Sequence, residues 1–318
     1  MKKLVFRAVL ALTLAFSACG GALAAEFLVP VGKVVGLSVA QGSVTVAAFD
    51  ETLGGAAKAA GLEVGDEILS LDGKTVDSVQ DLQQALTRSD GTIRLTVARE
   101  NRKLDLVWNP AVTDRGPKLG VYVREGITGI GTVTYYDPDS GEFGALGHGV
   151  SSPDGELAPL RSGNIYCATV TAVKLGKAGE PGQLKGAVGD LQPLGSLRRN
   201  CRFGIFGSCA PYPGEVLPTG QAKLGAAKIL SNVSGDSVET FRVEILRLAD
   251  DDNETGRDMM LKVTDEKLLT TTGGIVAGMS GSPIIQDGKL VGAVTHVLVN
   301  DPTRGYGIFI ENMLDAAG

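Results

Sequence analysis

Alternation of hydrophobic and polar residues runs through most of the chain after residue 27 and predicts short β-strands. Residues 93–97 and 104–108 each place apolar side chains at every second position, so together they predict a hairpin. Turn sequences at 137–141 and 287–288 separate further apolar runs later in the chain. Regular short strands bounded by turns are typical of an all-β sandwich or barrel.

Two helical segments interrupt the strands in the first third of the chain. A short helix ends at Gly61, where glycine can adopt the left-handed backbone of a helix cap. Ser78 can cap a second helix, whose apolar residues recur along one face over 79–86. We therefore predict a small α+β domain over residues 27–110, a linker near 112–118, and an all-β domain over 116–318.

The first 25 residues have the layout of a secretory signal. A basic start at residues 1–3 precedes a mostly apolar stretch over 4–18, and residues 22–24 fit an A-x-A cleavage site. Two alternatives stay open, namely retention as a short membrane anchor and lipidation at Cys19. In each case we expect the body of the protein to lie outside the cytoplasm, secreted or associated with a membrane.

Composition limits the partners and cofactors. The chain of 318 residues is 43% hydrophobic with a net charge of −6, which suits two domains with real cores and disfavours a nucleic-acid partner. Cys201 and Cys209 could close a small disulfide loop, while Cys167 is predicted to be buried among apolar neighbours. No C-x-x-C spacing supports zinc, and the acidic run 250–252 lacks the spaced ligands of a calcium loop. We expect no metal and no cofactor.

Both histidines of the chain lie in the second domain. His148 lies between two glycines directly after a predicted strand, so its imidazole is expected at a cleft or at the surface. His296 lies within the apolar stretch 291–299, where alternation places it on the same face as Val294 and Leu298. This pattern favours a structural role for His296.

Ser280 lies in the segment Gly278-Met279-Ser280-Gly281-Ser282-Pro283. This segment resembles the G-x-S-G-x-P box around the serine of chymotrypsin-like peptidases. The resemblance implies that the backbone amides of Gly278 and Ser280 point into one pocket and stabilise the oxyanion of a tetrahedral intermediate. Each such donor contributes about 3 to 4 kcal/mol to catalysis.

Residues 60–86, AGLEVGDEILSLDGKTVDSVQDLQQAL, resemble the second half of a PDZ domain of the bacterial protease type. Such domains take an extended peptide C-terminus as an added strand beside a glycine-containing loop and a helix. We place that loop at Val35, Gly36, Leu37 and Ser38, whose amides would face the ligand carboxylate. Alternatively, Gly36 only permits a turn and the groove is unused.

The PDZ-like segment, the sequence GHGV at 147–150 and the block 272–314 together resemble the stage IV sporulation protein B peptidase family. The resemblance implies a serine endopeptidase of chymotrypsin-like fold, made in an endospore former and exported across the forespore membrane. There it would cleave a membrane-associated regulator of an intramembrane metalloprotease and so release a late sigma factor. Self-cleavage near the N-terminus is also implied.

On this resemblance Ser280 is the nucleophile and His148 the general base. Asp265 matches the family aspartate by its position before residues 272–274, and Asp236 is its competitor for the third role. Thr295 could support the site through its hydroxyl, or could be an ordinary strand residue.

Two other functions remain open at this point. The chain could be a peptide-binding adaptor with a catalytically silent peptidase fold, or an envelope quality-control protease acting on unfolded termini. The presence of both His148 and Ser280 favours a peptidase over an adaptor.

Overall fold

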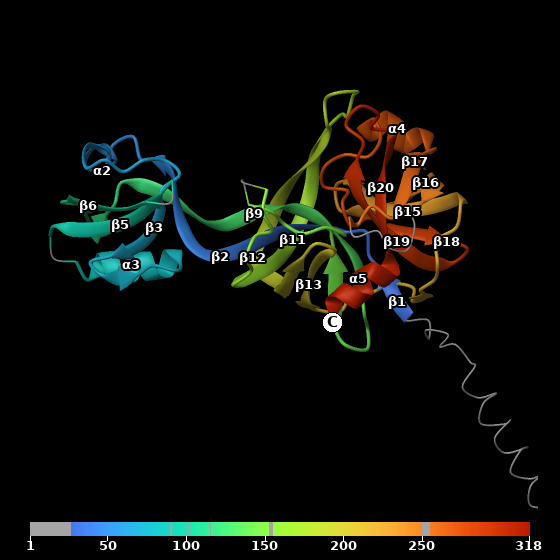
Figure 1. Cartoon of the computed structure of the whole chain (residues 1–318), viewed down its shortest axis with the longest axis horizontal. Helices are drawn as coiled ribbons and strands as arrows, with labels where there is room; N and C mark the ends of the chain where they lie inside the picture. The colour runs from blue at the N-terminus through green and yellow to red at the C-terminus, as the bar shows by residue number, and fades with distance from the viewer. Residues whose placement is uncertain (1–26, 90, 101, 115, 153–154, 250–254) are drawn as a thin grey trace, which may run out of the picture.

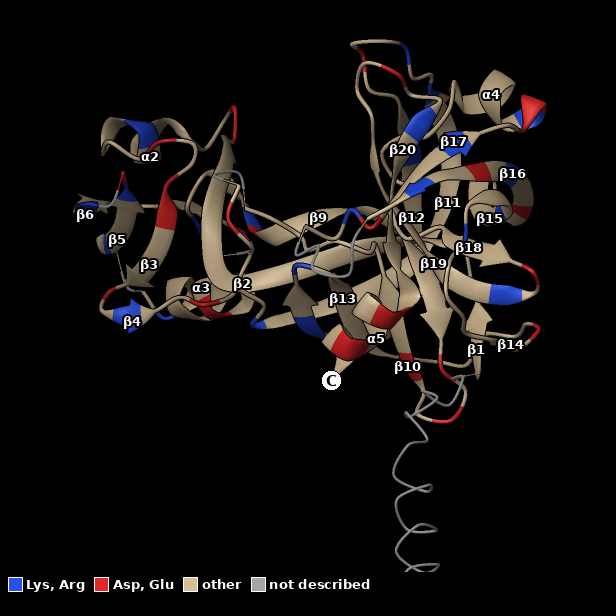
Figure 2. Cartoon of the chain, turned by 45° about the vertical axis from the view of Figure 1, so that its right-hand side comes forward, with Lys and Arg blue, Asp and Glu red and all other residues tan. Residues whose placement is uncertain are grey.

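The computed structural model describes residues 27–89, 91–100, 102–114, 116–152, 155–249 and 255–318 (Figure 1). The predicted signal with Cys19, and the acidic run 250–252, lie outside the described residues. The described chain is mainly β, as predicted, and forms a small lobe and a larger lobe. None of its described helices is long and apolar enough to span a membrane. Acidic and basic residues are interspersed over both lobes (Figure 2).

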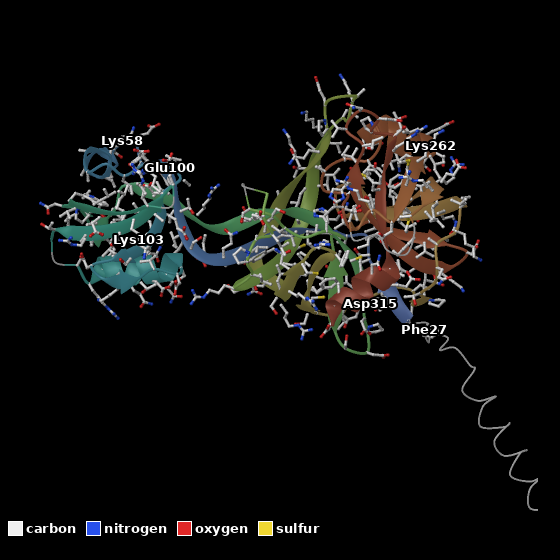
Figure 3. All side chains as sticks on the ribbon, in the orientation of Figure 1. Phe27, Lys58, Glu100, Lys103, Lys262 and Asp315 are labelled. Atoms are coloured by element: carbon white, nitrogen blue, oxygen red, sulfur yellow. The ribbon has the colours of Figure 1, made fainter. Side chains whose placement is uncertain are left out.

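The small lobe is the α+β unit that the sequence predicts. Its core contains the fully buried side chains of Ile68, Leu71, Ile93 and Leu95. Its elements are α2 (Gly55–Ala59), β3 (Glu67–Leu71), β4 (Lys74–Thr75), α3 (Val79–Thr87), β5 (Ile93–Arg99) and β6 (Arg102–Trp108). β5 and β6 form the predicted hairpin. Lys58 of α2, labelled in Figure 3, lies over the ring of Phe49 at 5.1 Å from its centroid.

The helix α3 begins where the sequence predicts. The hydroxyl of Ser78 accepts a hydrogen bond from the backbone amide of Asp81 at 3.1 Å, which satisfies one of the free amides of the first turn. Leu82, Ala85 and Leu86 are buried against the strands. The predicted linker forms a short hairpin of β7 (Ala111–Thr113) and β8 (Gly116–Lys118).

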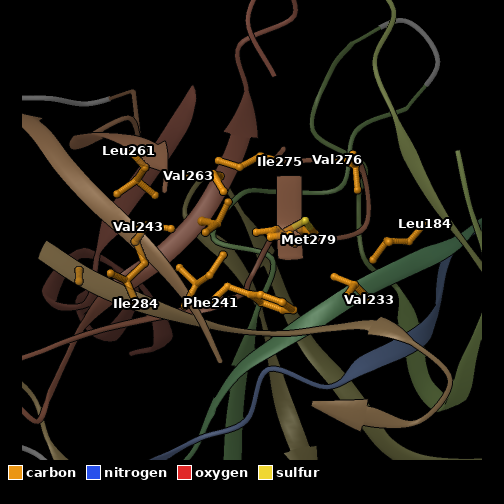
Figure 4. Close-up of a cluster of buried hydrophobic side chains, with 14 of the residues drawn as sticks. Leu184, Val233, Phe241, Val243, Leu261, Val263, Ile275, Val276, Met279 and Ile284 are labelled. Atoms are coloured by element: carbon orange, nitrogen blue, oxygen red, sulfur yellow. The ribbon is translucent and has the colours of Figure 1, made fainter. Parts of the chain in front are cut away.

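A closed six-stranded barrel makes up one half of the larger lobe. Its strands are, in barrel order, β15 (Gly225–Ser234), β16 (Ser237–Leu248), β17 (Met259–Val263), β20 (Arg304–Phe309), β19 (Lys289–Val297) and β18 (Pro283–Gln286). Phe241, Val243, Leu261 and Ile284 fill its interior (Figure 4). Helix α4 (Glu266–Thr272) follows β17, and α5 (Ile310–Ala317) ends the chain.

A ring of strands from the earlier part of the chain, called the first ring, makes up the other half of the larger lobe, and the closed barrel is the second ring. Strand pairings run in a circle through β2 (Val34–Phe49), β9 (Val121–Tyr136), β10 (Glu142–Ala145), β13 (Gly204–Cys209), β12 (Gln183–Cys201) and β11 (Ser162–Lys174), and then back to β2. The short strands β1 (Phe27–Pro30) and β14 (Leu217–Pro218) extend it beside β9. The two rings are the double barrel that the sequence predicts.

The strands β2 and β9 run through both lobes, which corrects the predicted domain boundary at residue 27. Residues 34–39 of β2 pair with 127–132 of β9 in the ring, whereas residues 44–49 pair with 121–125 in the small lobe. A register shift after Val39 separates the two stretches. The small domain is therefore inserted between two neighbouring strands of the first ring, β2 and β9. The sequence does not indicate where the chain first passes between the lobes, because β2 continues from the ring into the small lobe without a linker.

Two cysteine predictions are also corrected. Cys201 lies opposite Gly204 at the turn of the β12–β13 hairpin, and Cys209 lies opposite Gly195 at its far end. At about 3.3 Å per residue the two are about 16 Å apart along the hairpin, beyond the roughly 7 Å that a disulfide spans. All three described cysteines are free thiols. Cys167 is exposed rather than buried, because a register shift between Tyr166 and Ala168 turns it outward.

Candidate active site

His148 and Ser280 line one cavity of about 1010 Å³. His148 follows β10 of the first ring, and Ser280 immediately precedes β18 of the second. The cavity wall also contains Leu37 of β2 and Ile130 of β9. The two residues that the sequence singles out are therefore brought together between the rings.

The loop that carries Ser280 is pressed against the backbone of β9. The amide of Thr132 donates to the Ser280 carbonyl at 3.1 Å, and the Thr132 hydroxyl donates to the Gly278 carbonyl at 2.8 Å. Gly281 has a φ of +97°, and a Cβ atom there would lie 2.0 Å from the carbonyl oxygen of Thr132. Met279 anchors the loop from the other side, since its side chain is buried in the barrel core (Figure 4). Only glycine fits at position 281.

The amides of Gly278 and Ser280 are free to bind an anion. In the part of the chain that the structure describes, no protein acceptor receives either N–H. By contrast, the amides of Met279 and Gly281 donate to the carbonyls of Val276 (3.1 Å) and Val294 (2.7 Å). Gly278 has a φ of +100°, a left-handed backbone conformation that favours glycine. The local backbone thus supplies the two donors that an oxyanion site needs.

The hydroxyl of Ser280 donates a hydrogen bond of 2.6 Å to the carbonyl of Thr295. That carbonyl faces the cavity because the ladder between β19 and β20 shifts register between Val294 and His296, which is a β-bulge. The Thr295 hydroxyl is buried and has no partner among the described residues. In this structure Thr295 therefore contacts the serine through its backbone carbonyl, and support through its hydroxyl stays a prediction.

The imidazole of His148 is held by the neighbouring backbone. Its Nδ1 lies 2.9 Å from the carbonyl of Gly149, which can accept only if Nδ1 carries the proton. Burial lowers the pKa of His148, and the bond to Gly149 raises it by less. The ring is therefore neutral at pH 7 with its lone pair on Nε2. No hydrogen bond joins His148 to Ser280 among the described contacts, because the serine is turned toward Thr295.

Neither carboxylate predicted for the third role reaches the cavity. Asp265 is the N-cap of α4, where its side chain accepts from the amides of Lys267 and Leu268 at 3.1 and 3.2 Å. Asp236 binds the Lys33 ammonium and the Thr169 hydroxyl on the surface. Sequence position alone cannot show that a residue at the end of a strand caps the next helix. The structure thus gives both aspartates other partners.

His296 is the site residue that the sequence interpretation missed. It lines the same cavity, and its ring centroid lies 5.0 Å from that of His148. The bulge at Thr295 moves His296 off the inward face that strict alternation gave it. Burial, the charge of His148 and that of Arg257 lower its pKa to about 4. The scarcity of histidine was the one signal in the sequence that could have paired it with His148.

The predicted peptide-binding loop is not a loop of the small domain. Val35, Gly36, Leu37 and Ser38 lie within β2 and pair with β9 and β11 in the first ring. Position 36 instead needs glycine because Val188 packs closely against it. A Cβ atom there would lie 2.6 Å from a methyl carbon of Val188. Leu37 lines the cavity that holds Ser280.

Comparison with known proteins places the two lobes in two families. Residues 115–314 match the family described as SpoIVB peptidase S55, and residues 52–99 match the PDZ domain. The fold, the cavity and these matches place the protein in the class of peptidase-family proteins that carry a PDZ domain. Because the first match covers well over half of the chain, the chain belongs to the SpoIVB peptidase S55 family.

Individual relatives share only parts of the chain. A protein of Bartonella henselae named as a zinc metalloprotease is 34% identical over 82 residues, which are 26% of this chain and 22% of that protein. One of Rhizobium meliloti, also named as a zinc metalloprotease, is 31% identical over 139 residues, which are 43% of this chain and 35% of that protein. The chain thus spans about a third or less of the length of these relatives.

Two solved structures are similar at a low level. An inactive form of the Rv3671c protease has a TM-score of 0.35 and 15% identity, and the match covers 59% of this chain and 84% of that one. A serine-to-alanine mutant of the same protease from M. tuberculosis gives a TM-score of 0.33 and 15% identity over 59% and 82% of the two chains.

Proposed function

We propose that this protein is an endopeptidase in which Ser280 attacks the scissile carbonyl and His148 acts as general base. The observation that carries this proposal is the meeting of His148, Ser280 and two free loop amides in one cavity between the rings. A neutral imidazole with its lone pair on Nε2 is the form that a general base requires.

The reaction follows from these positions. The Ser280 hydroxyl leaves the carbonyl of Thr295 and turns toward His148, whose Nε2 takes the proton as Oγ bonds to the substrate carbon. The amides of Gly278 and Ser280 stabilise the oxyanion. His148 then protonates the leaving amine, and water hydrolyses the acyl-enzyme by the same proton transfers in reverse.

The small domain supplies a second place for an extended peptide. Residues 121–125 of β9 pair with β2 on one side, and no other described strand pairs with this stretch. Helix α3 lies beside it, since the amide of Val79 donates to the carboxylate of Glu125 at 3.0 Å. A peptide C-terminus would add to this edge of β9 between the strand and α3.

The setting we propose is export from an endospore-forming cell, with the N-terminal segment as signal or anchor and self-cleavage near it. The substrate would be a membrane-associated regulator of an intramembrane protease. The family match and the layout of residues 1–25 support this setting. A quality-control protease of the cell envelope would use the same chemistry on other substrates.

One observation favours a second candidate, a catalytically silent adaptor that binds peptides through its PDZ domain. The Ser280 hydroxyl donates to Thr295 rather than to His148. An adaptor would keep this arrangement permanently, whereas a peptidase must leave it on binding substrate.

Labelling with a fluorophosphonate distinguishes the two candidates. A peptidase forms a covalent adduct at Ser280, and Ser280→Ala abolishes the adduct while His148→Ala slows its formation by about 100-fold or more. Thermal unfolding of each variant confirms that the fold is kept. Absence of an adduct on the intact protein, or equal labelling of all three proteins, would contradict the peptidase and favour the adaptor.

A further inference from the structure

We propose that His296 is a positioning residue of this site, whose ring holds the His148 ring toward Ser280. This inference rests on the proposed peptidase function. The two ring centroids are 5.0 Å apart with an interplanar angle of 38°, and both rings line the cavity. One bulge in β19 thus provides two consecutive contacts, the Thr295 carbonyl on the nucleophile and the His296 ring against the base.

The hydrogen bond to Gly149 holds the His148 ring within its own loop, so a contact from outside that loop is needed to place the ring relative to Ser280. The carbonyl of Gly149 accepts from Nδ1 and so sets the tautomer, but this carbonyl belongs to the next residue and moves with the same loop. Among the described residues that line the cavity, Glu156 carries the one carboxylate, and it is exposed. His296 comes from β19 of the second ring, which pairs with β18 and β20, so it ties the histidine loop to the barrel that carries Ser280.

The charge state of His296 suits this role. Its pKa of about 4 keeps His296 neutral at pH 7, so it places no second positive charge beside His148 when His148 takes the proton from Ser280. Arg257 contributes to this low pKa, and among the described residues that line the cavity Arg202 and Glu156 carry charged side chains. With its centroid 5.0 Å from that of His148, the His296 ring occupies space that water would otherwise fill. Removing it should solvate His148 and raise the pKa of His148 toward its ordinary value of 6.5.

The test compares His296→Ala, which removes the ring, with His296→Phe, which keeps a ring but no nitrogen. The rate of fluorophosphonate labelling is measured from pH 4 to 9. Because the base must be neutral, labelling is lost as the pH falls through the pKa of His148. We expect His296→Ala to lower the labelling rate at pH 7 by about 10- to 100-fold. We also expect the acidic limb of the pH–rate profile, where the rate falls, to shift to higher pH. His296→Phe should leave this limb at the same low pH as in the intact protein and keep the labelling rate within about threefold of that of the intact protein.

A second measurement does not depend on activity. NMR titration of untagged His296→Phe and His296→Ala proteins follows a single imidazole, since the chain contains two histidines. We expect a higher pKa for His148 in the alanine variant than in the phenylalanine variant. Val299→Ala, an exposed change just beyond β19, is the control and should match the intact protein.

Three results would overturn the inference. They are an unchanged rate and limb in His296→Ala, a phenylalanine variant as slow as the alanine variant while both unfold normally, or equal His148 pKa values in the two variants. Failure of the peptidase proposal has a different signature, because the intact protein would then form no adduct at Ser280 while the titration difference would persist.

Discussion

Gly281 shows how one missing side chain shapes the site. The adjacent serine loop can lie on the backbone of β9 only because nothing projects from position 281 toward Thr132 and Leu146. The same closeness lets Thr132 bind the carbonyls on both sides of Met279. Glycine here serves the packing of the loop rather than access of the substrate.

We therefore expect Gly281→Ala to destabilise the protein and to abolish labelling of Ser280. Gly288→Ala is a matched control, because Gly288 has a φ of +74° but open space around its Cβ position. The control should cost about 1 to 2 kcal/mol from backbone strain alone. Gly281→Ala should cost about 1 to 3 kcal/mol more from the clash. Denaturant unfolding measures both, and equal free energies of unfolding would contradict the packing argument.

At the same scale, glycines made His148 and Ser280 predictable from the sequence, whereas bulges concealed their neighbours. Alternation assigns each strand residue to a face, and one extra residue reverses every assignment beyond it. The register shifts at Cys167 and at Thr295 reversed two such assignments. Nothing in the local composition marks either shift.

Helix α4 depends on the residue that the family resemblance placed in the catalytic site. Burial raises the pKa of Asp265, but the backbone amides and the charge of Arg242 lower it by more, so the carboxylate is charged as a helix cap. We expect Asp265→Ala to cost about 1 kcal/mol of stability and Asp265→Asn only a few tenths, because asparagine also caps helices.

Labelling rates separate this structural role from a catalytic one. Both Asp265 variants should react with fluorophosphonate at the rate of the intact protein, measured well below their melting temperatures. A large loss of rate in the folded Asp265→Asn variant would restore Asp265 to the catalytic site.

Among the elements, the hairpins were predictable and the long strands were not. The turns at 137–141 and 287–288 join strands that pair as expected, since their polar residues lie between two clear apolar runs. β2 combines a ring segment and a small-domain segment in 16 residues, so its glycine at position 36 suggested a ligand loop. Pairing over long sequence separations leaves no local signal.

On the scale of the whole molecule, the inserted small domain changes which part of the chain can fold alone. The fragment 116–318 corresponds to the domain that the sequence predicted, but it lacks β1 and β2. Without β2, the first ring opens and exposes the edges of β9 and β11. We expect this fragment to show no cooperative unfolding and no labelling at Ser280.

Replacing residues 41–125 by Asn-Gly is the matched experiment. Val39 and Ile127 are cross-strand partners, so a short hairpin turn can rejoin β2 to β9 at the edge of the ring. This variant should unfold cooperatively and label at Ser280. A fragment 116–318 that folds and labels as well as this variant would restore the predicted boundary.

The passage of both β2 and β9 between the two lobes also determines how the small domain can move. A module on one flexible tether samples a wide volume and keeps no fixed orientation to its neighbour. Here both attachments are adjacent, hydrogen-bonded strands, and Leu37 and Ile130 of the same two strands line the cavity. A bend or twist that passes along these strands beyond the register shift at residues 40–43 would therefore reach the cavity wall, so the small domain and the place where peptides would be cut are linked through the same two strands.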